Sequence, residues 1–367
     1  MCTRRPFILE RLSFIFASHH QSLPNKARNI RLTTIALQQT ASWQEILSGT
    51  VREASELCRL LELDKSSLPD SHPLLKNFPV RVPGPYLSRI KKGCPDDPLL
   101  LQVFPDPREA HQVAGYSENP LQEDQANPLP GILHKYNGRA LLLATGGCAI
   151  HCRYCFRRHF PYEDQLPGKD LWQHSLEYIR DDNSINEIIL SGGDPLTLPD
   201  RYLAWFLDEL STFSHVRRIR IHTRLPIMIP ERITAGLSQI LANSRFRTIV
   251  VLHSNHAQEF DVSVDEACNR LQATGAVLLN QSVLLKGVND SAETLVELSE
   301  RLFSAGVLPY YLHVLDKVQG AAHFDLTEAQ AIALVRQMQT RLPGYLVPRL
   351  VREVPGEGAK SSIDLNP

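Results

Sequence analysis

The sequence predicts an α/β fold built on a parallel sheet. From about residue 140, short runs rich in β-branched and apolar residues alternate with helical stretches. After the first run the spacing is about 30 residues, the length of one strand and one helix in a βα unit. Strands that alternate with helices pair in parallel, so six repeats indicate six parallel strands, in an open sheet or an incomplete barrel. The six runs are 140–145, 187–191, 217–223, 247–253, 276–285 and 308–315.

The helix boundaries between these runs carry their own signals. Ser263 and Asp290 are each followed three residues later by a glutamate, a capping-box pattern that predicts the start of a helix. Gly275 and Gly306 stand where those two helices should stop, because glycine readily adopts the left-handed conformation that closes a helix. The boundary signals therefore agree with the alternation of strands and helices.

The chain is predicted to divide into four regions. A helical pattern over 42–63 and a proline-rich stretch over 64–130 indicate an N-terminal helical and irregular region ahead of the alternating core. After the core, a helix over 327–341 leads into a tail rich in proline and glycine. The four predicted regions are 1–40, 41–139, 140–326 and 327–367.

The first of these regions, 1–40, is a basic extension. Its first 35 or so residues hold six lysines and arginines against one acid, Glu10. Transit peptides share this composition. We favour a disordered extension, or a start codon placed too far upstream.

Composition excludes several classes of protein. The net charge is −1, which gives no general attraction to nucleic acid or to an anionic membrane. No stretch of about 18 apolar residues predicts a membrane span. Three of the seven cysteines crowd into eight residues, whereas a disulfide framework would be dispersed. The clustering indicates a metal site in a reducing compartment, which we take to be the cytoplasm.

Cys148, Cys152 and Cys155 directly follow the first predicted strand. Thiolates are the usual ligands of iron–sulfur clusters, and a four-iron cluster needs four ligands. Three thiolates leave one iron open, and S-adenosylmethionine could bind it through its amino and carboxyl groups. Active sites of parallel α/β folds lie at the carboxyl ends of strands, which suits this position. The alternative is a zinc site in which His159 is the fourth ligand.

A second motif, Gly192-Gly193-Asp194, ends the second predicted strand. Paired glycines let the backbone approach a ligand closely, and Asp194 could accept a hydrogen bond from an ammonium group. The motif comes one βα unit after the cysteines, and this position favours a ligand-binding role over an ordinary strand-to-helix turn.

Together these motifs resemble radical S-adenosylmethionine enzymes, and more narrowly the lysine 2,3-aminomutase family. The details are most similar to the bacterial branch that makes (R)-β-lysine for elongation factor P. The match runs from about Trp43 to Lys360, and family members adopt a partial (β/α)6 barrel, which implies that architecture here. The matching segments are Cys-Arg-Tyr-Cys-Phe-Arg-Arg-His (152–159), Leu-Ser-Gly-Gly-Asp-Pro-Leu (190–196), Asn-Gln-Ser-Val-Leu-Leu-Lys-Gly-Val-Asn-Asp (280–290) and Pro-Tyr-Tyr-Leu-His (309–313).

The resemblance implies three cofactors and residues to hold them. The cysteines would bind a 4Fe–4S cluster. Pyridoxal 5′-phosphate would form a Schiff base with Lys360, and its phosphate would contact Tyr136 and Arg139. S-adenosylmethionine is the third cofactor. The residues implied to bind it are Tyr154, Gly192, Gly193, Asp194, His253 and Gln281.

The resemblance also implies how L-lysine binds. Arg157 would hold its α-carboxylate through two parallel hydrogen bonds, while Asp316 and Glu353 would hold its ε-ammonium. We interpret Arg158 as a member of a structural ion pair. The free aminomutases carry aspartate where Glu353 stands, and a further arginine in place of His159. These departures leave the stereochemistry of the product open.

The implied reaction converts L-α-lysine to β-lysine, by inference the R form. A 5′-deoxyadenosyl radical and a pyridoxal phosphate imine would carry the amino group from one carbon to the next. The implied partners are a reducing electron donor, elongation factor P and its β-lysine ligase. The resemblance also leaves a homo-oligomer open. Two alternatives remain at this point: another radical S-adenosylmethionine reaction without pyridoxal phosphate, or a zinc-stabilised binding module.

Overall fold

A computed structural model describes residues 41–64, 78–162 and 169–366. The basic extension predicted over 1–40 lies outside the described residues. Ser42–Pro367 form one compact unit, to which everything below refers.

The described part of this unit holds a nine-stranded sheet in which the strands follow one another in chain order. Strands β2 to β8 run parallel to their neighbours, and antiparallel β1 and β9 pair at the two ends. The strands are β1 (Ile132–Tyr136), β2 (Arg139–Thr145), β3 (Glu187–Gly192), β4 (Arg218–Thr223), β5 (Arg247–His253), β6 (Val277–Val283), β7 (Leu308–His313), β8 (Arg349–Arg352) and β9 (Ser361–Ser362).

The six predicted strands correspond to β2 through β7, so the predicted parallel α/β architecture is confirmed. The structure adds a seventh parallel strand, β8, in the tail that we expected to be irregular. Its four residues, Arg-Leu-Val-Arg after Pro348, are too short for an alternating pattern to be recognised. Backbone pairing of Tyr311 with Arg349 and of His313 with Val351 makes this segment a strand.

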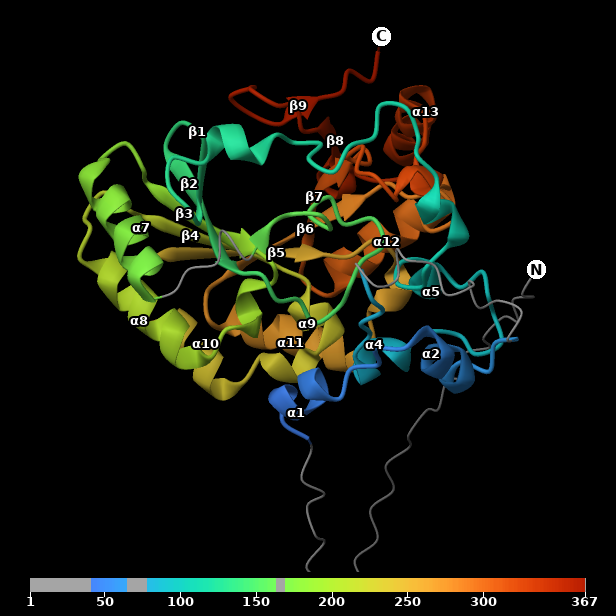
Figure 1. The fold of residues 1–367 in the computed structure, drawn as a ribbon, viewed down its shortest axis with the longest axis horizontal. Coiled ribbons are helices and arrows are strands. Elements are labelled where there is room, and N and C mark those ends of the chain that lie inside the picture. The colour runs from blue at the N-terminus through green and yellow to red at the C-terminus, as the bar shows by residue number, and fades with distance from the viewer. Residues whose placement is uncertain (1–40, 65–77, 163–168, 367) are drawn as a thin grey trace, which may run out of the picture. The chain divides into compact units, whose positions relative to one another are not determined.

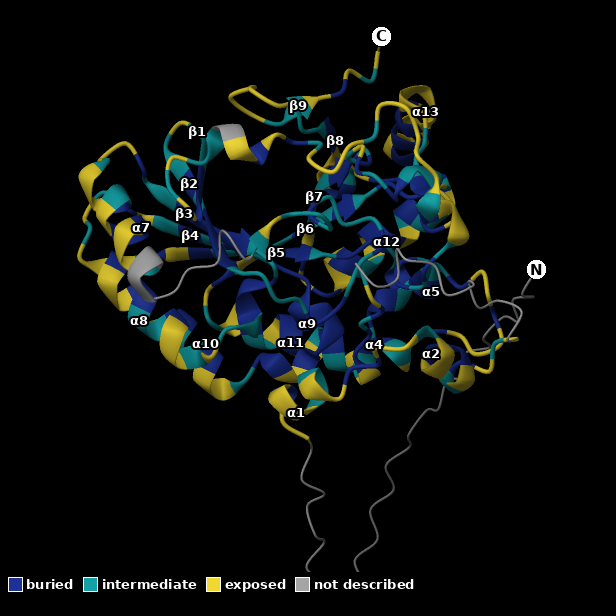
Figure 2. Cartoon of the chain, viewed as in Figure 1, coloured by how far each residue is buried: buried dark blue, intermediate teal, exposed yellow. Residues whose placement is uncertain are grey.

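Helices cover the outer face of the curved sheet (Figure 1). Buried residues concentrate on the strands and on the helix faces turned toward them, whereas the outer helix faces are exposed (Figure 2). The longer helices are α7 (Lys169–Asp181), α8 (Asp200–Ser211), α10 (Ala235–Asn243), α11 (Val262–Ala273), α12 (Ala292–Ser304) and α13 (Glu328–Gln339). The short ones are α1 (Trp43–Ser48), α2 (Ala54–Leu60), α4 (Gly84–Leu87), α5 (Pro98–Leu101) and α9 (Leu225–Met228), with 3-10 turns η2 (Pro107–Ala110), η3 (Glu123–Ala126), η4 (Pro195–Thr197), η5 (Pro230–Arg232), η6 (Ala257–Glu259), η7 (Ala322–Phe324) and η8 (Gly344–Leu346).

Two details of the helices differ from expectation. The single helix predicted over 42–63 is two helices, α1 and α2, because Gly49 caps the first and Val51 then pairs with Val82. The helix starts near 263 and 290 are set by Asp261 and Ser291, whose side chains accept from backbone N–H groups three residues on.

The expected stops of those two helices are confirmed. Gly275 and Gly306 have φ of +83° and +71° and follow the helix ends, in the left-handed conformation that closes a helix.

The alternation of side chains along each strand separates the core from the site. On β4, Ile219 and Ile221 are buried in the core formed with the helices, and each contributes about 1.5–3 kcal/mol by leaving water. The intervening residues Arg220 and His222 project to the opposite face. The sheet therefore presents polar side chains on its inner face, which we call the lumen.

Among the described residues, the structure has no helix with the length and apolar character needed to cross a membrane.

Candidate functional site

The cysteine loop, residues 146–155, begins where β2 ends. Cys148, Cys152 and Cys155 are free, half-buried thiols, and the backbone N–H of Cys155 donates to the carbonyl of Cys152 at 3.0 Å. Burial, followed by the neighbouring Cys152, raises the pKa of Cys155 to about 11. Thiols this close and this shielded need positive charge to ionise, and iron would supply it.

The alternative zinc site is not assembled in the described part of the chain. No three His, Cys, Asp or Glu side chains there converge as ligands of a single metal ion. The Nε2 atom of His159 instead lies 3.2 Å from the carbonyl oxygen of Gln319.

The Gly-Gly-Asp turn after β3 packs directly on the cysteine loop. The N–H groups of Gly193 and Asp194 donate to the carbonyls of Thr145 and Gly147 at 2.6 and 2.8 Å. A side chain at Gly193 would overlap the backbone of Gly147, and Gly192 has φ of +105°. The glycines are therefore needed for close approach to this loop, whereas the sequence suggested close approach to a ligand.

Asp194 is held by the protein on both sides of its carboxylate. One carboxylate oxygen accepts from the Leu196 N–H (3.1 Å) and the Thr223 hydroxyl (2.6 Å). The other accepts from the N–H groups of Arg224 (2.7 Å) and Leu225 (2.9 Å). Asp194 therefore joins the Gly-Gly-Asp turn to the end of β4, and its contact with S-adenosylmethionine stays a prediction.

Tyr154, predicted to contact S-adenosylmethionine, is held by the protein through its hydroxyl group. The hydroxyl accepts from the amide of Asn255 at 2.7 Å and donates to the side-chain oxygen of Gln102 at 3.4 Å. Only its ring remains available for a ligand.

Three inward-facing side chains on β4, β5 and β6 form a neutral group in the lumen. The amide Nε2 of Gln281 lies 3.0 Å from Nε2 of His253, whose ring makes an edge-to-face contact with His222 at 5.6 Å. Burial lowers the pKa of His253 to about 3, and it also lowers that of His222. Both imidazoles are therefore neutral at physiological pH.

Two polar atoms of this group are buried without a hydrogen-bond partner within the described ranges: His222 Nε2 and Gln281 Oε1. Buried polar atoms are normally satisfied, so these point to a ligand. Gln281 and His253 were predicted to bind S-adenosylmethionine, whereas His222 was missed. Its inward position on β4, beside β5, was the available signal.

A chain of alternating charges runs through the lumen. The ammonium of Lys360 donates to Glu353 Oε2 at 2.9 Å, and Lys135 Nζ lies 3.2 Å from Glu353 Oε1. Lys135 also lies 3.4 Å from Glu123, which binds Arg157 through two hydrogen bonds of 2.8 Å. Arg157 and Lys360, predicted to serve substrate and cofactor, thus lie at the two ends of one ion chain.

Arg157 uses one edge of its guanidinium for Glu123 and turns Nη1 toward the Gly-Gly-Asp turn. Nη1 lies 3.3 Å from the Ser191 hydroxyl and 3.4 Å from the Gly192 carbonyl. These contacts are long, so this edge can still receive a carboxylate. Glu123 and Lys135 were not predicted as site residues, because only the fold brings 3-10 turn η3 and strand β1 to Arg157.

The two acids predicted to bind an ammonium lie within electrostatic range of each other and differ in protonation. Burial, followed by Glu353, raises the pKa of Asp316 to about 7. Burial also acts to raise the pKa of Glu353, but Lys360 and Lys135 outweigh it and lower the pKa to about 2. Of these two carboxyls, Glu353 is therefore ionised and Asp316 partly protonated at physiological pH.

The residues predicted to hold a phosphate lie at the β1–β2 hairpin. The Tyr136 hydroxyl donates to Glu353 at 3.1 Å, and the Arg139 guanidinium stacks 4.6 Å above the Tyr136 ring. The structure brings Tyr136 to the Lys360 end of the ion chain; the phosphate contact itself stays a prediction.

Arg158 forms a structural ion pair, as interpreted from the sequence. Its Nη2 donates to Glu109 at 2.6 Å, and Arg153 binds the same carboxylate. Both arginines also stack on Phe78.

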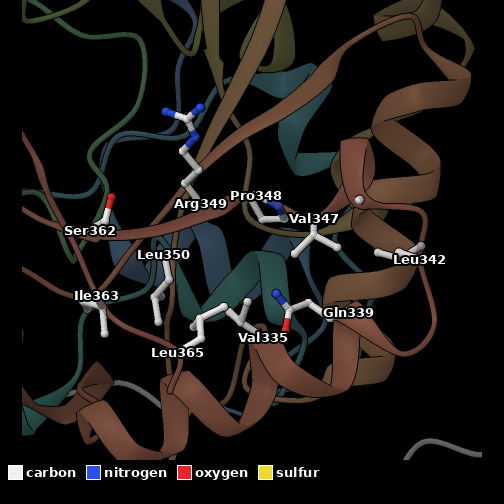
Figure 3. Close-up of a pocket in the computed structure, with 11 residues that line it drawn as sticks. Val335, Gln339, Leu342, Val347, Pro348, Arg349, Leu350, Ser362, Ile363 and Leu365 are labelled. Carbon is white, nitrogen blue, oxygen red and sulfur yellow. The ribbon is translucent and has the colours of Figure 1, made fainter. Parts of the chain in front are cut away.

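A pocket of about 400 Å³ lies elsewhere, between α13 and the β8–β9 segment. Figure 3 shows Val335, Leu350, Ile363 and Leu365 around it. None of the predicted site residues lines this pocket. It lies under the segment that carries Glu353 and Lys360 and is not part of the charged lumen.

Comparison with known proteins places these features in a family. The Radical SAM superfamily model matches residues 142–236. The chain is 48% identical to the L-lysine 2,3-aminomutase of Escherichia coli over 91% of this chain and 98% of that one. Identity is 46% with that of Haemophilus influenzae (89% and 96%) and 32% with that of Clostridium subterminale (88% and 77%).

The residues present fit the cofactors of that family. The three thiols suit a 4Fe–4S cluster, the unpartnered atoms of His222 and Gln281 suit S-adenosylmethionine, and the amine of Lys360 suits pyridoxal phosphate. This fit and the matches to L-lysine 2,3-aminomutases favour a pyridoxal phosphate-dependent radical enzyme over the two alternatives left open by the sequence, a radical enzyme without pyridoxal phosphate and a zinc-stabilised module. The chain belongs to the lysine 2,3-aminomutase family of radical S-adenosylmethionine isomerases, whose cofactors are the 4Fe–4S cluster, S-adenosylmethionine and pyridoxal phosphate.

Proposed function

We propose that this protein isomerises L-α-lysine to β-lysine by moving the α-amino group to the neighbouring carbon. The observation that carries the proposal is the lumen ion chain, which has Arg157 at one end and Glu353 with Lys360 at the other. Lysine has a carboxylate at one end and an ammonium at the other, so its charges match this arrangement.

The roles of the residues follow from their charges. The free edge of Arg157 receives the α-carboxylate, and Asp316 with Glu353 receives the ε-ammonium. Asp316, with a pKa of about 7, gives up its proton when the ammonium arrives. When bound, the cluster and S-adenosylmethionine supply a carbon-centred radical, and pyridoxal phosphate carries the migrating amino group.

The decisive assay is anaerobic turnover of free L-lysine with S-adenosylmethionine and a reductant, with chiral analysis of β-lysine. Removing one partner of a buried charge pair costs about 3–5 kcal/mol. Asp316→Ala should therefore reduce kcat/KM by roughly 10² to 10⁴. Asp325→Ala is the matched control, because Asp325 binds Tyr116 and not the lumen. Wild-type turnover by Asp316→Ala would overturn the proposed pocket.

We further propose that the product is (R)-β-lysine destined for elongation factor P, and that the reaction takes place in the cytoplasm. Three observations support this. Glu353 stands where the free aminomutases carry aspartate, and identity is higher with the E. coli and H. influenzae proteins than with the clostridial one. Free thiols at Cys58 and Cys268 suit a reducing compartment.

The test of the elongation factor link uses intact mass to detect attachment, and chiral analysis after hydrolysis of the factor to tell β-lysine from α-lysine, because the two isomers have the same mass. Elongation factor P, its β-lysine ligase and the reaction product should yield a modified factor. If the enzyme converts lysine only after its attachment to the factor, free lysine stays unchanged while attached lysine rearranges. The S product, or a product that the ligase rejects, would contradict the link and leave the isomerase activity standing.

A further inference from the structure

Arg224 is a buried arginine, 6% exposed, that directly follows β4. Its backbone N–H is held by Asp194, and α9 begins at the next residue, Leu225. The side chain starts from this anchored position and reaches the cysteine loop. Burial of a guanidinium requires several partners; Nη1 and Nη2 of Arg224 have them, whereas its buried Nε has no hydrogen-bond partner within the described ranges.

The guanidinium contacts a cysteine and two polar side chains. Nη1 donates to Cys152 Sγ at 2.8 Å. Nη2 donates to Gln102 Oε1 at 2.6 Å and to Glu259 Oε2 at 3.1 Å. The rings of Tyr86 and Tyr154 lie 5.6 and 5.8 Å from the guanidinium carbon. Arg224 therefore has little freedom to move away from the thiol.

Glu259 does not cancel the effect of Arg224 at the sulfur. It is fully buried and contacts Nη2, whereas the sulfur is contacted by Nη1. Its other oxygen accepts from the backbone N–H groups of Asn255 and His256, which offset part of its negative charge. The positive group is thus the one next to the thiol.

This contact distinguishes Cys152 from the other two cysteines. Cations also lie near them: Arg81 interacts with Cys148, and Arg157 and Arg158 interact with Cys155. Within residues 41–64, 78–162 and 169–366, however, Arg224 is the one charged side chain that donates a hydrogen bond to any of the three cysteine thiols.

We infer that Arg224 is a positioning residue that makes the 4Fe–4S cluster easier to reduce by donating a hydrogen bond to its Cys152 ligand. The cluster gains one negative charge when it takes up one electron from the reductant. A guanidinium in a buried setting stabilises that charge, and hydrogen bonds to cluster sulfurs raise reduction potentials. The inference concerns the cluster alone and does not depend on lysine being the substrate.

The test is a potentiometric titration of the reconstituted cluster without S-adenosylmethionine or lysine, followed by electron paramagnetic resonance of the reduced form. The variant is Arg224→Gln with Glu259→Gln, which removes both buried charges together. At the midpoint potential of the wild-type cluster, the ratio of reduced to oxidised cluster in this variant should be about tenfold lower than in wild type. This is equivalent to a reduction potential about 59 mV lower for a one-electron couple. Arg224→Lys keeps the charge, so it should show a smaller fall.

The matched control is Arg232→Lys. Arg232 is also a buried arginine after β4, but it donates to the carbonyls of Leu196 and Leu198 and not to a thiol. The ratio of reduced to oxidised cluster in Arg232→Lys should equal that of wild type. A wild-type ratio in the double variant, with iron content intact, overturns the inference.

A third variant decides the question if the Arg224 variants fail to hold iron. Glu259→Gln leaves Arg224 in place and removes its counter-charge, so the cluster should become easier to reduce and the ratio should rise. An unchanged or lower ratio in a variant with wild-type iron content would then count against the inference.

Discussion

The cysteine loop and the lumen ion chain meet at Arg157, yet they hold their functional groups differently. The loop presents three thiols from eight consecutive residues and is supported by Gly193 and Arg224. The ion chain joins separate segments, so that no two of Glu123, Lys135 and Glu353 are sequence neighbours.

The two regions also differ in what a ligand must displace. The cysteine loop is held by hydrogen bonds within the protein, and the protein groups that make these bonds do not resemble groups of a cofactor. In the lumen, by contrast, Arg157 already holds a carboxylate and Glu353 already holds an ammonium, the two groups that lysine carries. Loss of a loop thiol should therefore act in an all-or-none way, whereas conservative changes of the lumen carboxylates should be graded.

The largest effect is expected in the loop. Cys148→Ala should lose the cluster of about four irons and all activity, because a cubane needs each of its three protein thiolates. Iron content and the visible spectrum of anaerobically reconstituted protein report this directly. Cys268→Ala is the control, since that thiol is buried among the helices. Full iron content in Cys148→Ala would break the distinction between the regions.

The next largest effect is expected in the lumen, and it should leave the cysteine loop unaffected. Lys360→Ala should keep the cluster and lose the covalent link to pyridoxal phosphate, because the Lys360 amine is the nucleophile. Borohydride reduction followed by peptide mass spectrometry should locate the pyridoxyl group on Lys360 in wild type. Lys317→Gln, at an exposed lysine near Asp316, should label normally. Label on another lysine would reassign the role.

A smaller change within the lumen should be graded. Glu353→Asp withdraws the carboxylate by one methylene from Lys360, Lys135 and Tyr136. Hydrogen bonds to charged groups contribute about 1.5–3 kcal/mol, so kcat/KM should fall roughly 10- to 100-fold or the enantiomer ratio of β-lysine should change. Glu357→Asp serves as the control at an exposed site. Complete inactivity would show that the lumen, too, is all-or-none.

The smallest effect concerns stability of the cofactor-free protein. The pKa of Asp316 rises from 3.8 to about 7 on folding, so the folded state binds more protons between these values. The contribution of Asp316 to stability must then fall as pH rises through this window and level off above pH 7. Asp316→Asn removes the fall and should stabilise the protein at pH 8 by on the order of 2 kcal/mol, after allowance for screening.

Thermal denaturation at pH 8 and pH 5 measures this difference. The melting temperature of Asp316→Asn should exceed that of wild type by a few degrees at pH 8 and by less at pH 5. An equal gain at both values would place the cause outside Asp316 ionisation.

Much of the fold could be predicted from the sequence. Strands β2 to β7 each alternate with a helical stretch along the chain, and Gly275 and Gly306 mark helix ends. The end strands β1, β8 and β9 could not be predicted in the same way. Strand β9 has two residues and β8 has four, so pairing with a neighbour, and not local pattern, makes them strands.

The sequence by itself determined the cluster chemistry, because three cysteines within eight residues are brought together by covalent connection alone, whatever the rest of the chain does. It also determined the fold class through its strand–helix alternation. Only the tertiary structure decided the counter-charges: Glu123 beside Arg157, Lys360 beside Glu353, and Arg224 beside Cys152. The physical reason is that a buried charge is stabilised by whichever opposite group the neighbouring strands and loops place within a few ångströms, and residues far apart in sequence carry no record of that distance.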